Sequence, residues 1–247
     1  MNIRQYLDST YLKTATQAGL SESANTSVVK TCIQEAIDEN FKLIMIRPDH
    51  VVLAKEMILK ANSVVQVGTV IDFPEGKSCL EDKLQEANLA IQNGVDEIDF
   101  VCNYEAFKVG DIDLVKEEIV KGSKLGLENG KIVKWIIEVA ALNDKQIIQI
   151  ATLIKNCIIS NFEERQYCSV FVKSSTGFYK TEDGLPNGAT IPTIIMMLEN
   201  ASPLPIKAAG GVRTYAEARE MISLGVKRIG TSGAKSIANG TSAESEY

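Results

Sequence analysis

Residues 205–230, PIKAAGGVRTYAEAREMISLGVKRIG, contain the repeating unit of the chain. Its apolar start, 205–209, predicts a strand, and residues 227–230 predict the next one. Between them, Thr214 and Glu217 have the spacing of a capping box, which predicts a helix start. Gly225 is a typical helix end. A strand, a helix and a second strand in so short a stretch predict a parallel βαβ unit.

The same alternation runs back along the chain. Apolar runs rich in valine and isoleucine predict strands at residues 42–46, 64–71, 95–102, 132–139 and 168–172, with a candidate first strand at 5–9. Helix starts are predicted between them by Ser78 with Glu81, Asn143 with Gln146, and Thr190-Ile191-Pro192, and a further helix over 28–37.

Eight strands with intervening helices in 247 residues fit an α/β protein of the (β/α)8 TIM-barrel class. A doubly wound sheet is the competing architecture, but no G-x-G-x-x-G follows an early strand. Without a linker-like segment, we expect a single domain over residues 1–247, with a short flexible C-terminal tail over about 238–247.

Composition narrows the function. The net charge of −6 argues against nucleic-acid or anionic-membrane partners. The single histidine, His50, excludes most zinc sites and Ser–His or Cys–His catalysis, so we expect no metal. The five scattered cysteines indicate reduced thiols and a cytoplasmic location. The start lacks an apolar signal core, and no apolar run approaches the ~20 residues of a membrane span.

Charges inside the predicted strands are the informative positions, because strands of a parallel barrel are buried on both faces. Lys173 ends one apolar strand and Lys207 lies in the next, while Asp99 lies inside an earlier strand. With a side-chain period of two, Asp99 shares a face with Glu97 and points into the barrel. Burial and a second ammonium both lower the pKa of a lysine, which favours Schiff-base chemistry. The alternative is that these lysines reach the rim or pair with acids.

Lys134 is a third strand lysine. It can pair with Asp99, and that pair can hold the interior together or take part in proton transfer. The residues alone leave both interpretations open.

Two small-residue turns predict an anion site. Gly210 and Gly211 precede the helix start at Thr214, and residues 230–233 follow the last strand. Loops after strands seven and eight of such barrels often bind phosphate through backbone N–H groups.

At these residues the chain resembles the deoxyribose-phosphate aldolase family of class I aldolases. The matching segments span nearly the whole chain and read DST (8–10), GTVIDFPEG (68–76), DEID (96–99), VKSSTG (172–177) and IKAAGGVRT (206–214). The resemblance implies a (β/α)8 barrel that reversibly cleaves 2-deoxyribose 5-phosphate to acetaldehyde and glyceraldehyde 3-phosphate, without a cofactor. It also implies a phosphorylated sugar as partner and a homo-oligomer, a dimer.

The resemblance further implies residue roles. Lys173 matches the Schiff-base lysine, and Lys207 the neighbour that lowers its pKa. Asp99 with Lys134 matches the pair that moves protons, and Tyr247 resembles a terminal tyrosine that assists proton exchange. The substrate and phosphate contacts implied are Asp8, Thr10, Thr176, Gly177, Gly210, Gly211, Ser232 and Gly233.

Two other functions remain open on the residues alone. One is a Schiff-base aldolase for a longer ketose phosphate, and the other is a barrel that binds a phosphorylated metabolite without turnover. The chain also departs from the family. Met45 stands where many relatives have cysteine, and Gly233 where some have a second serine. Arg47, Asp72 and Glu75 replace residues that are usually uncharged, and acids near a phosphate weaken its binding by repulsion. We expect these departures to change substrate affinity rather than the reaction.

Overall fold

The computed structural model describes residues 1–182 and 184–240. Eight strands form a closed barrel in which each pairs with its sequence neighbours and β8 pairs with β1, all in parallel. The strands are β1 Leu7–Thr10, β2 Leu43–Ile46, β3 Gln66–Ile71, β4 Glu97–Val101, β5 Ile132–Ile136, β6 Val170–Lys173, β7 Ile206–Ala209 and β8 Arg228–Thr231. All eight predicted strands are confirmed, including the candidate at the start of the chain.

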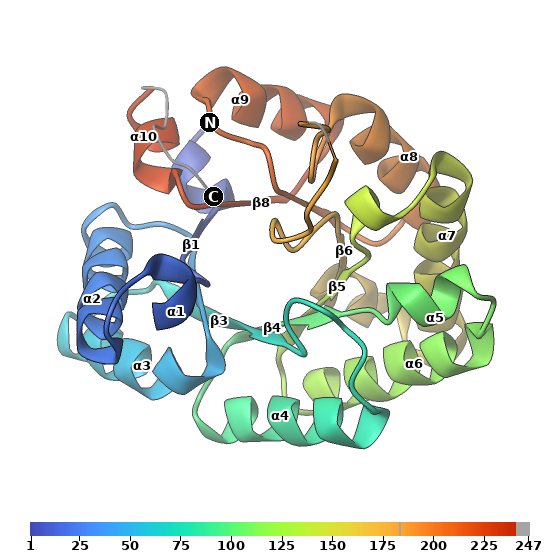
Figure 1. The fold of residues 1–247 in the computed structure, drawn as a ribbon, viewed down its shortest axis with the longest axis horizontal. Helices are drawn as coiled ribbons and strands as arrows, with labels where there is room; N and C mark the ends of the chain where they lie inside the picture. Colours follow the sequence, from blue (N-terminus) through green and yellow to red (C-terminus); the bar gives the residue numbers. More distant parts are fainter. Residues whose placement is uncertain (183, 241–247) are drawn as a thin grey trace.

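Helices surround the barrel (Figure 1). They are α1 Ala15–Ala18, α2 Glu22–Asp38, α3 Val51–Lys60, α4 Leu80–Gln92, α5 Tyr104–Lys108, α6 Ile112–Glu128, α7 Asp144–Asn161, α8 Ile191–Ala201, α9 Tyr215–Leu224 and α10 Ala234–Ala238. Short 3-10 turns occur at Ile3–Tyr6, Pro48–His50, Val139–Ala141 and Glu164–Ser169. The (β/α)8 class is therefore confirmed.

Helix caps explain most of the boundaries. Full capping boxes begin α7 at Asn143, α8 at Thr190 and α9 at Thr214. The three helix starts are as predicted, although the start at Thr190 was predicted from Pro192 and not from a capping box. The box predicted at Ser78 is wrong, because α4 begins one residue later. The Ser78 hydroxyl donates to Oδ1 of Asp72 at 2.7 Å, and its backbone N–H donates to Oδ2 at 2.8 Å. The carboxylate at the end of β3 therefore engages the serine that would have capped the helix.

The core has two different layers. Outside the barrel wall, strand and helix side chains form an apolar layer in which Phe100 stacks on Trp135 with ring centroids 4.9 Å apart. Gly122 permits this contact, since a Cβ there would lie 2.9 Å from the indole ring. Inside the barrel, the side chains include buried charges. Asp99 is one of them, as the strand parity predicted.

Two predictions fall on residues that the structure does not describe. Residues 241–247 lie outside the described residues, and with them Tyr247 and most of the expected tail. Among the described helices, none combines the length and the apolar character that crossing a bilayer requires.

Candidate active site

The barrel register brings the predicted lysines together. β4 and β5 place Asp99 beside Lys134, and β6 and β7 place Lys173 beside Lys207. All four side chains are buried. Their strands are apolar at the alternate positions, which pack against helices, so the polar residues are left to the interior.

Asp99 is the centre of this group. Its Oδ1 accepts a hydrogen bond from Lys134 Nζ at 2.7 Å, and its Oδ2 lies 2.9 Å from Lys173 Nζ and 2.8 Å from Lys207 Nζ. Burial alone would raise the pKa of Asp99, but the three ammonium groups outweigh it and hold the pKa well below its usual range. The predicted Lys134–Asp99 pair is therefore present, and it is part of a larger cluster.

Lys173 differs from its neighbours in the cluster. Burial lowers its pKa to about 8, Asp99 opposes this shift, and the adjacent charge of Lys207 adds to it. By contrast, burial of Lys134 is outweighed by Asp99 and Glu97, which raise its pKa. Lys173 also lines a pocket at the barrel mouth. A buried amine that is neutral for a sizeable fraction of molecules near pH 7 can attack a carbonyl carbon.

The sequence analysis assigned no role to Glu97 and Arg228, two charged residues next to this cluster. Arg228 on β8 donates to Oδ1 of Asp8 at 2.7 Å and to Oε1 of Glu97 at 2.8 Å. Asp8 in turn lies 2.6 Å from Lys207 Nζ. The signals that could have found them are the shared face of Glu97 and Asp99, and the charge at position 228 inside a predicted strand.

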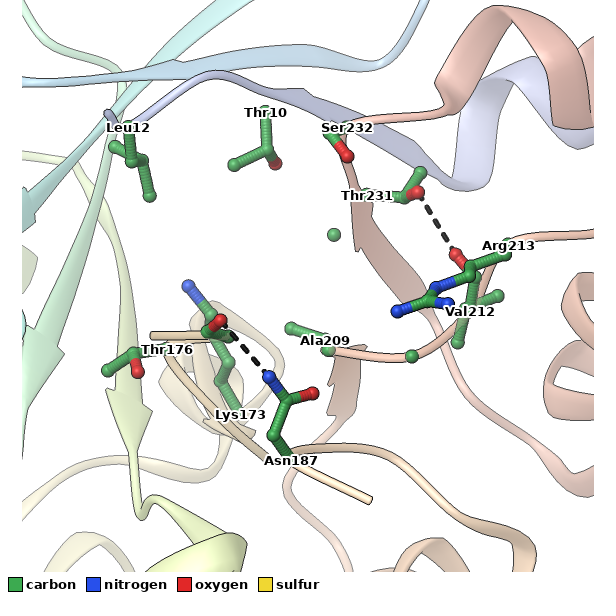
Figure 2. Close-up of a pocket in the computed structure, with 14 residues that line it drawn as sticks. Thr10, Leu12, Lys173, Thr176, Asn187, Ala209, Val212, Arg213, Thr231 and Ser232 are labelled. Carbon is green, nitrogen blue, oxygen red and sulfur yellow. Dashed lines mark hydrogen bonds between the residues drawn. The ribbon is translucent and has the colours of Figure 1, made fainter. Parts of the chain in front are cut away.

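Most of the predicted phosphate contacts line the pocket. Figure 2 shows Lys173, Thr176 and Asn187 on one side, with Thr10, Thr231 and Ser232 opposite. The other lining residues are Leu12, Gly177, Ala209, Gly210, Gly211, Val212, Arg213 and Gly230. Of the described residues predicted for substrate binding, Asp8 and Gly233 stand apart from this lining. Asp8 is instead fully buried under Lys207.

The pocket wall near α9 can bind an anion. Gly177, Gly210 and Gly211 have positive φ of 81°, 78° and 88°, a backbone conformation that other residues rarely adopt. A Cβ at Gly188 would lie 2.4 Å from the Gly210 carbonyl oxygen, so the segment between β6 and α8 packs directly on this turn. Arg213, to which the sequence patterns gave no role, adds a guanidinium beside the capped N-terminus of α9.

Glu138 supports the opposite wall and was also missed. It follows β5 with a positive φ of 54°, and its Oε2 accepts hydrogen bonds from both the N–H and the hydroxyl of Thr176. Burial raises the pKa of Glu138, although the Thr176 bonds oppose this shift. The loop after Lys173 is thus held from beneath by a carboxylate.

The acidic departures Asp72 and Glu75 lie outside the lining of this pocket. Asp72 is engaged by Ser78 and lies 3.5 Å from Lys83 Nζ, and Glu75 pairs with Lys77 at 3.0 Å, so both are turned to other partners. Neither Asp72 nor Glu75 is among the described residues that line the pocket around Lys173.

Arg47 and Met45 have structural roles near the pocket. Arg47 donates to the backbone oxygens of Leu12 and Phe73, at 2.8 and 3.1 Å, and stacks on the Phe73 ring. Buried Met45 fills the space left by Gly68, where a Cβ would meet the Met45 methyl at 2.6 Å.

These features define the class of the protein as a (β/α)8 barrel with a desolvated lysine in a pocket that is lined in part by glycine backbone. In the described residues, no group of three or more His, Cys, Asp or Glu side chains is arranged to hold a metal ion.

Comparisons with known proteins give the family. No protein-family model matches the chain. A deoxyribose-phosphate aldolase from Thermococcus gammatolerans is 36% identical over 241 residues, 97% of this chain and 96% of the relative. One from Exiguobacterium sibiricum is 34% identical over 249 residues, covering both chains fully. The chain belongs to the deoxyribose-phosphate aldolase family.

Solved structures agree with this assignment. The aldolase QR15 superposes with a TM-score of 0.80 at 28% identity, covering 97% of this chain and 95% of the other. The deoxyribose phosphate aldolase from Aeropyrum pernix, described as tetrameric, has a TM-score of 0.76 at 28% identity, covering 96% of this chain and 89% of the other.

Proposed function

We propose that the chain reversibly cleaves 2-deoxy-D-ribose 5-phosphate to acetaldehyde and D-glyceraldehyde 3-phosphate through a Schiff base on Lys173. The observation that carries this proposal is the position of Lys173, whose pKa burial lowers to about 8 and which opens onto the pocket. The names of the full-length relatives supply the substrate.

The reaction begins when neutral Nζ of Lys173 attacks C1 of the open-chain sugar. The carbinolamine loses its oxygen as water and becomes a protonated imine, which acts as the electron sink. When the C3 hydroxyl gives up its proton, the C2–C3 bond breaks and its electron pair moves toward the imine. C3 leaves as the aldehyde of glyceraldehyde 3-phosphate, and an enamine remains on Lys173. Protonation at C2 and hydrolysis then release acetaldehyde and the free lysine.

The other residues have supporting roles in this scheme. Asp99, with Lys134 2.7 Å away, would move protons at the carbinolamine and enamine steps. The pocket wall formed by Gly177, Gly210 and Gly211, together with Ser232, would bind the phosphate. Thr10 and Thr176 would contact the sugar. No cofactor or metal is needed, because the imine supplies the electron sink.

Tyr247 is proposed to assist proton exchange at the enamine carbon, on the strength of the family resemblance alone. We expect Tyr247→Phe to slow hydrogen–deuterium exchange of acetaldehyde methyl protons while cleavage falls less. An unchanged exchange rate would exclude this role.

The central test is borohydride trapping. Reduction in the presence of 2-deoxyribose 5-phosphate should leave a secondary amine on Lys173, read by peptide mass. The matched control omits the sugar. An unmodified Lys173 in the presence of substrate would sink the proposal.

We also propose that the chain is one domain, and that it forms a homodimer in the cytoplasm. The tetrameric relative from Aeropyrum pernix supports an oligomer, and the five free cysteines support a reducing compartment. Light scattering of the purified protein tests the dimer, and a monomeric mass would contradict it.

A further inference from the structure

A closed ring of six alternating charges lies beneath Lys173. It runs from Arg228 through Asp8, Lys207, Asp99, Lys134 and Glu97 and back to Arg228. Its members come from β1, β4, β5, β7 and β8, so five of the eight strands contribute to it. All six side chains are buried.

The contacts around the ring are short on every side. From Asp8, Oδ2 lies 2.6 Å from Lys207 Nζ, and Oδ1 lies 2.5 Å from the Arg228 guanidinium. From Lys134, Nζ lies 2.7 Å from Asp99 and 2.5 Å from Glu97. Each cation therefore contacts two different carboxylates, and each carboxylate contacts two different cations of the ring.

Lys173 stands outside the ring. Within the described part of the chain it forms a single ion pair, with Asp99 at 2.9 Å, and that carboxylate already serves both Lys207 and Lys134. Three cations and three anions make the ring neutral by itself. A protonated Lys173 therefore places one positive charge beside a ring that is neutral by itself.

We propose that Arg228 and Glu97 are positioning residues, which set the protonation of Lys173 by fixing the net charge of this ring. Neither residue is among the described residues that line the pocket. Removing a cation from the ring leaves it negative, which favours the protonated form of Lys173. Removing an anion leaves it positive, which favours the neutral amine. The consequence for turnover rests on the proposed function, but the effect on Lys173 itself does not.

The charged groups that act directly on Lys173 are Asp99 on β4, Lys134 on β5, Lys207 on β7 and Glu138 after β5. Asp8 on β1, Glu97 on β4 and Arg228 on β8 are linked to these groups through the ring. Glu138 lies outside the ring, and its Oε2 accepts a hydrogen bond from the Thr176 N–H. It is the same in each variant below, so the direction of each shift depends on the ring alone.

The experiment measures Lys173 without any sugar. Trace acetic anhydride acylates only neutral amines: Nζ attacks the acyl carbon, acetate leaves and the proton goes to solvent. The extent of acetylation of the Lys173 peptide, read by mass against pH, gives the midpoint of its titration. The variants are Arg228→Met, Glu97→Gln and the double variant. The control is Glu117→Gln, which removes the same charge from an exposed pair with Lys121 on α6.

We expect the two single variants to move in opposite directions. Arg228→Met should raise the midpoint by about one pH unit, and Glu97→Gln should lower it by about one unit. The double variant, whose remaining charges again balance, should return close to wild type, and Glu117→Gln should not move it. A structural role for Arg228 and Glu97 predicts lost stability without opposite shifts.

Two outcomes would overturn the proposal: a wild-type midpoint in both Arg228→Met and Glu97→Gln, or a shift of these two variants in the same direction. If Arg228→Met does not fold, Glu97→Gln and Asp8→Asn still test it, because both keep the side-chain shape and both should lower the midpoint. A midpoint that is unchanged or raised in these two variants would then overturn the proposal. Because no sugar is present, a failed borohydride trap would leave this measurement intact, and the reverse also holds.

Discussion

Lys83 and Lys173 are both buried lysines, with 1% and 2% of their surfaces exposed, yet their surroundings differ. Lys83 on α4 lies outside the barrel wall. Its ammonium donates to Gly76 O at 2.8 Å, to Val101 O at 3.2 Å and to Glu118 Oε1 at 2.8 Å. Three N–H donors thus have three acceptors, and the group ties the loop after β3 to β4 and α6.

Lys173 has one carboxylate partner and two cations close by. Burial by itself therefore does not make a nucleophile. The two sites differ in the number of acceptors and in the sign of the neighbouring charges. Burial lowers the pKa of Lys173 to about 8, Asp99 opposes this shift, and the charges of Lys207 and Lys134 add to it. The comparison predicts that turnover depends on Lys173 and that the stability of the fold depends on Lys83.

The largest effect is expected for Lys173→Met. Turnover should fall by at least about a thousandfold, because Lys173 is the one lysine among the described residues that line the pocket. Lys83→Met is the matched control, and its folded fraction should turn over at close to the wild-type rate. Steady-state kinetics on both variants check this, and comparable losses would break the comparison.

Lys207→Met should come next. Losing the neighbouring cation raises the pKa of Lys173, so less of it is neutral near pH 7, and turnover should drop roughly a hundredfold. The acid limb of the pH–rate profile should move to higher pH at the same time. Near-normal activity with an unmoved limb would exclude the role assigned to Lys207.

The wild-type rate should itself depend on pH. Because the pKa of Lys173 is lowered to about 8, the neutral fraction falls about tenfold per unit below pH 8. Turnover should therefore rise toward a plateau above about pH 8, when imine formation limits the rate.

The free energy of unfolding should also rise with pH between about 8 and 10.5, since the unfolded chain binds more protons there. Lys173→Met should lack that rise in a urea titration.

Lys83→Met should act on stability instead. It leaves Glu118 buried without its cation, which costs about 3–5 kcal/mol of unfolding free energy. Urea denaturation measures this. Lys121→Met, which breaks an exposed pair on α6, serves as the control and should leave the midpoint unchanged. A Lys83 variant as stable as this control would show that its three bonds contribute little.

The smallest effect is expected from metal removal. Turnover in EDTA should equal that in buffer, because the imine on Lys173 takes the electron pair that a metal would otherwise stabilise. A loss in EDTA that zinc or magnesium restores would contradict the Schiff-base scheme.

The sequence predicted the barrel well, because capped helices such as Thr214–Gly225 and apolar strands set the βαβ rhythm locally. It also predicted that Asp99 faces inward, since strand parity is a local property. The predicted cap at Ser78 was wrong because of a tertiary contact: the Ser78 hydroxyl donates a hydrogen bond to Asp72, which follows β3.

Site residues divide in the same way. Lys173 and Lys207 stand out in the sequence because a lysine inside an apolar strand is unusual. Arg228 escaped because its partners, Asp8 and Glu97, lie 220 and 131 positions away in the chain. Glu138 escaped because its hydrogen bonds to Thr176 join two loops whose meeting depends on the β5–β6 register. Pairings of this kind follow from closure of the barrel and not from any local pattern.

The ionic interior also bears on how the fold responds to heat. Hydration of charged groups becomes less favourable as temperature rises, so the cost of withdrawing the six ring charges from water declines on warming. An aliphatic barrel core gains no such relief. Burial of the ring charges around Lys173 should therefore destabilise the fold less near the melting temperature than at low temperature. The melting temperature itself should depend mainly on the apolar layer between strands and helices.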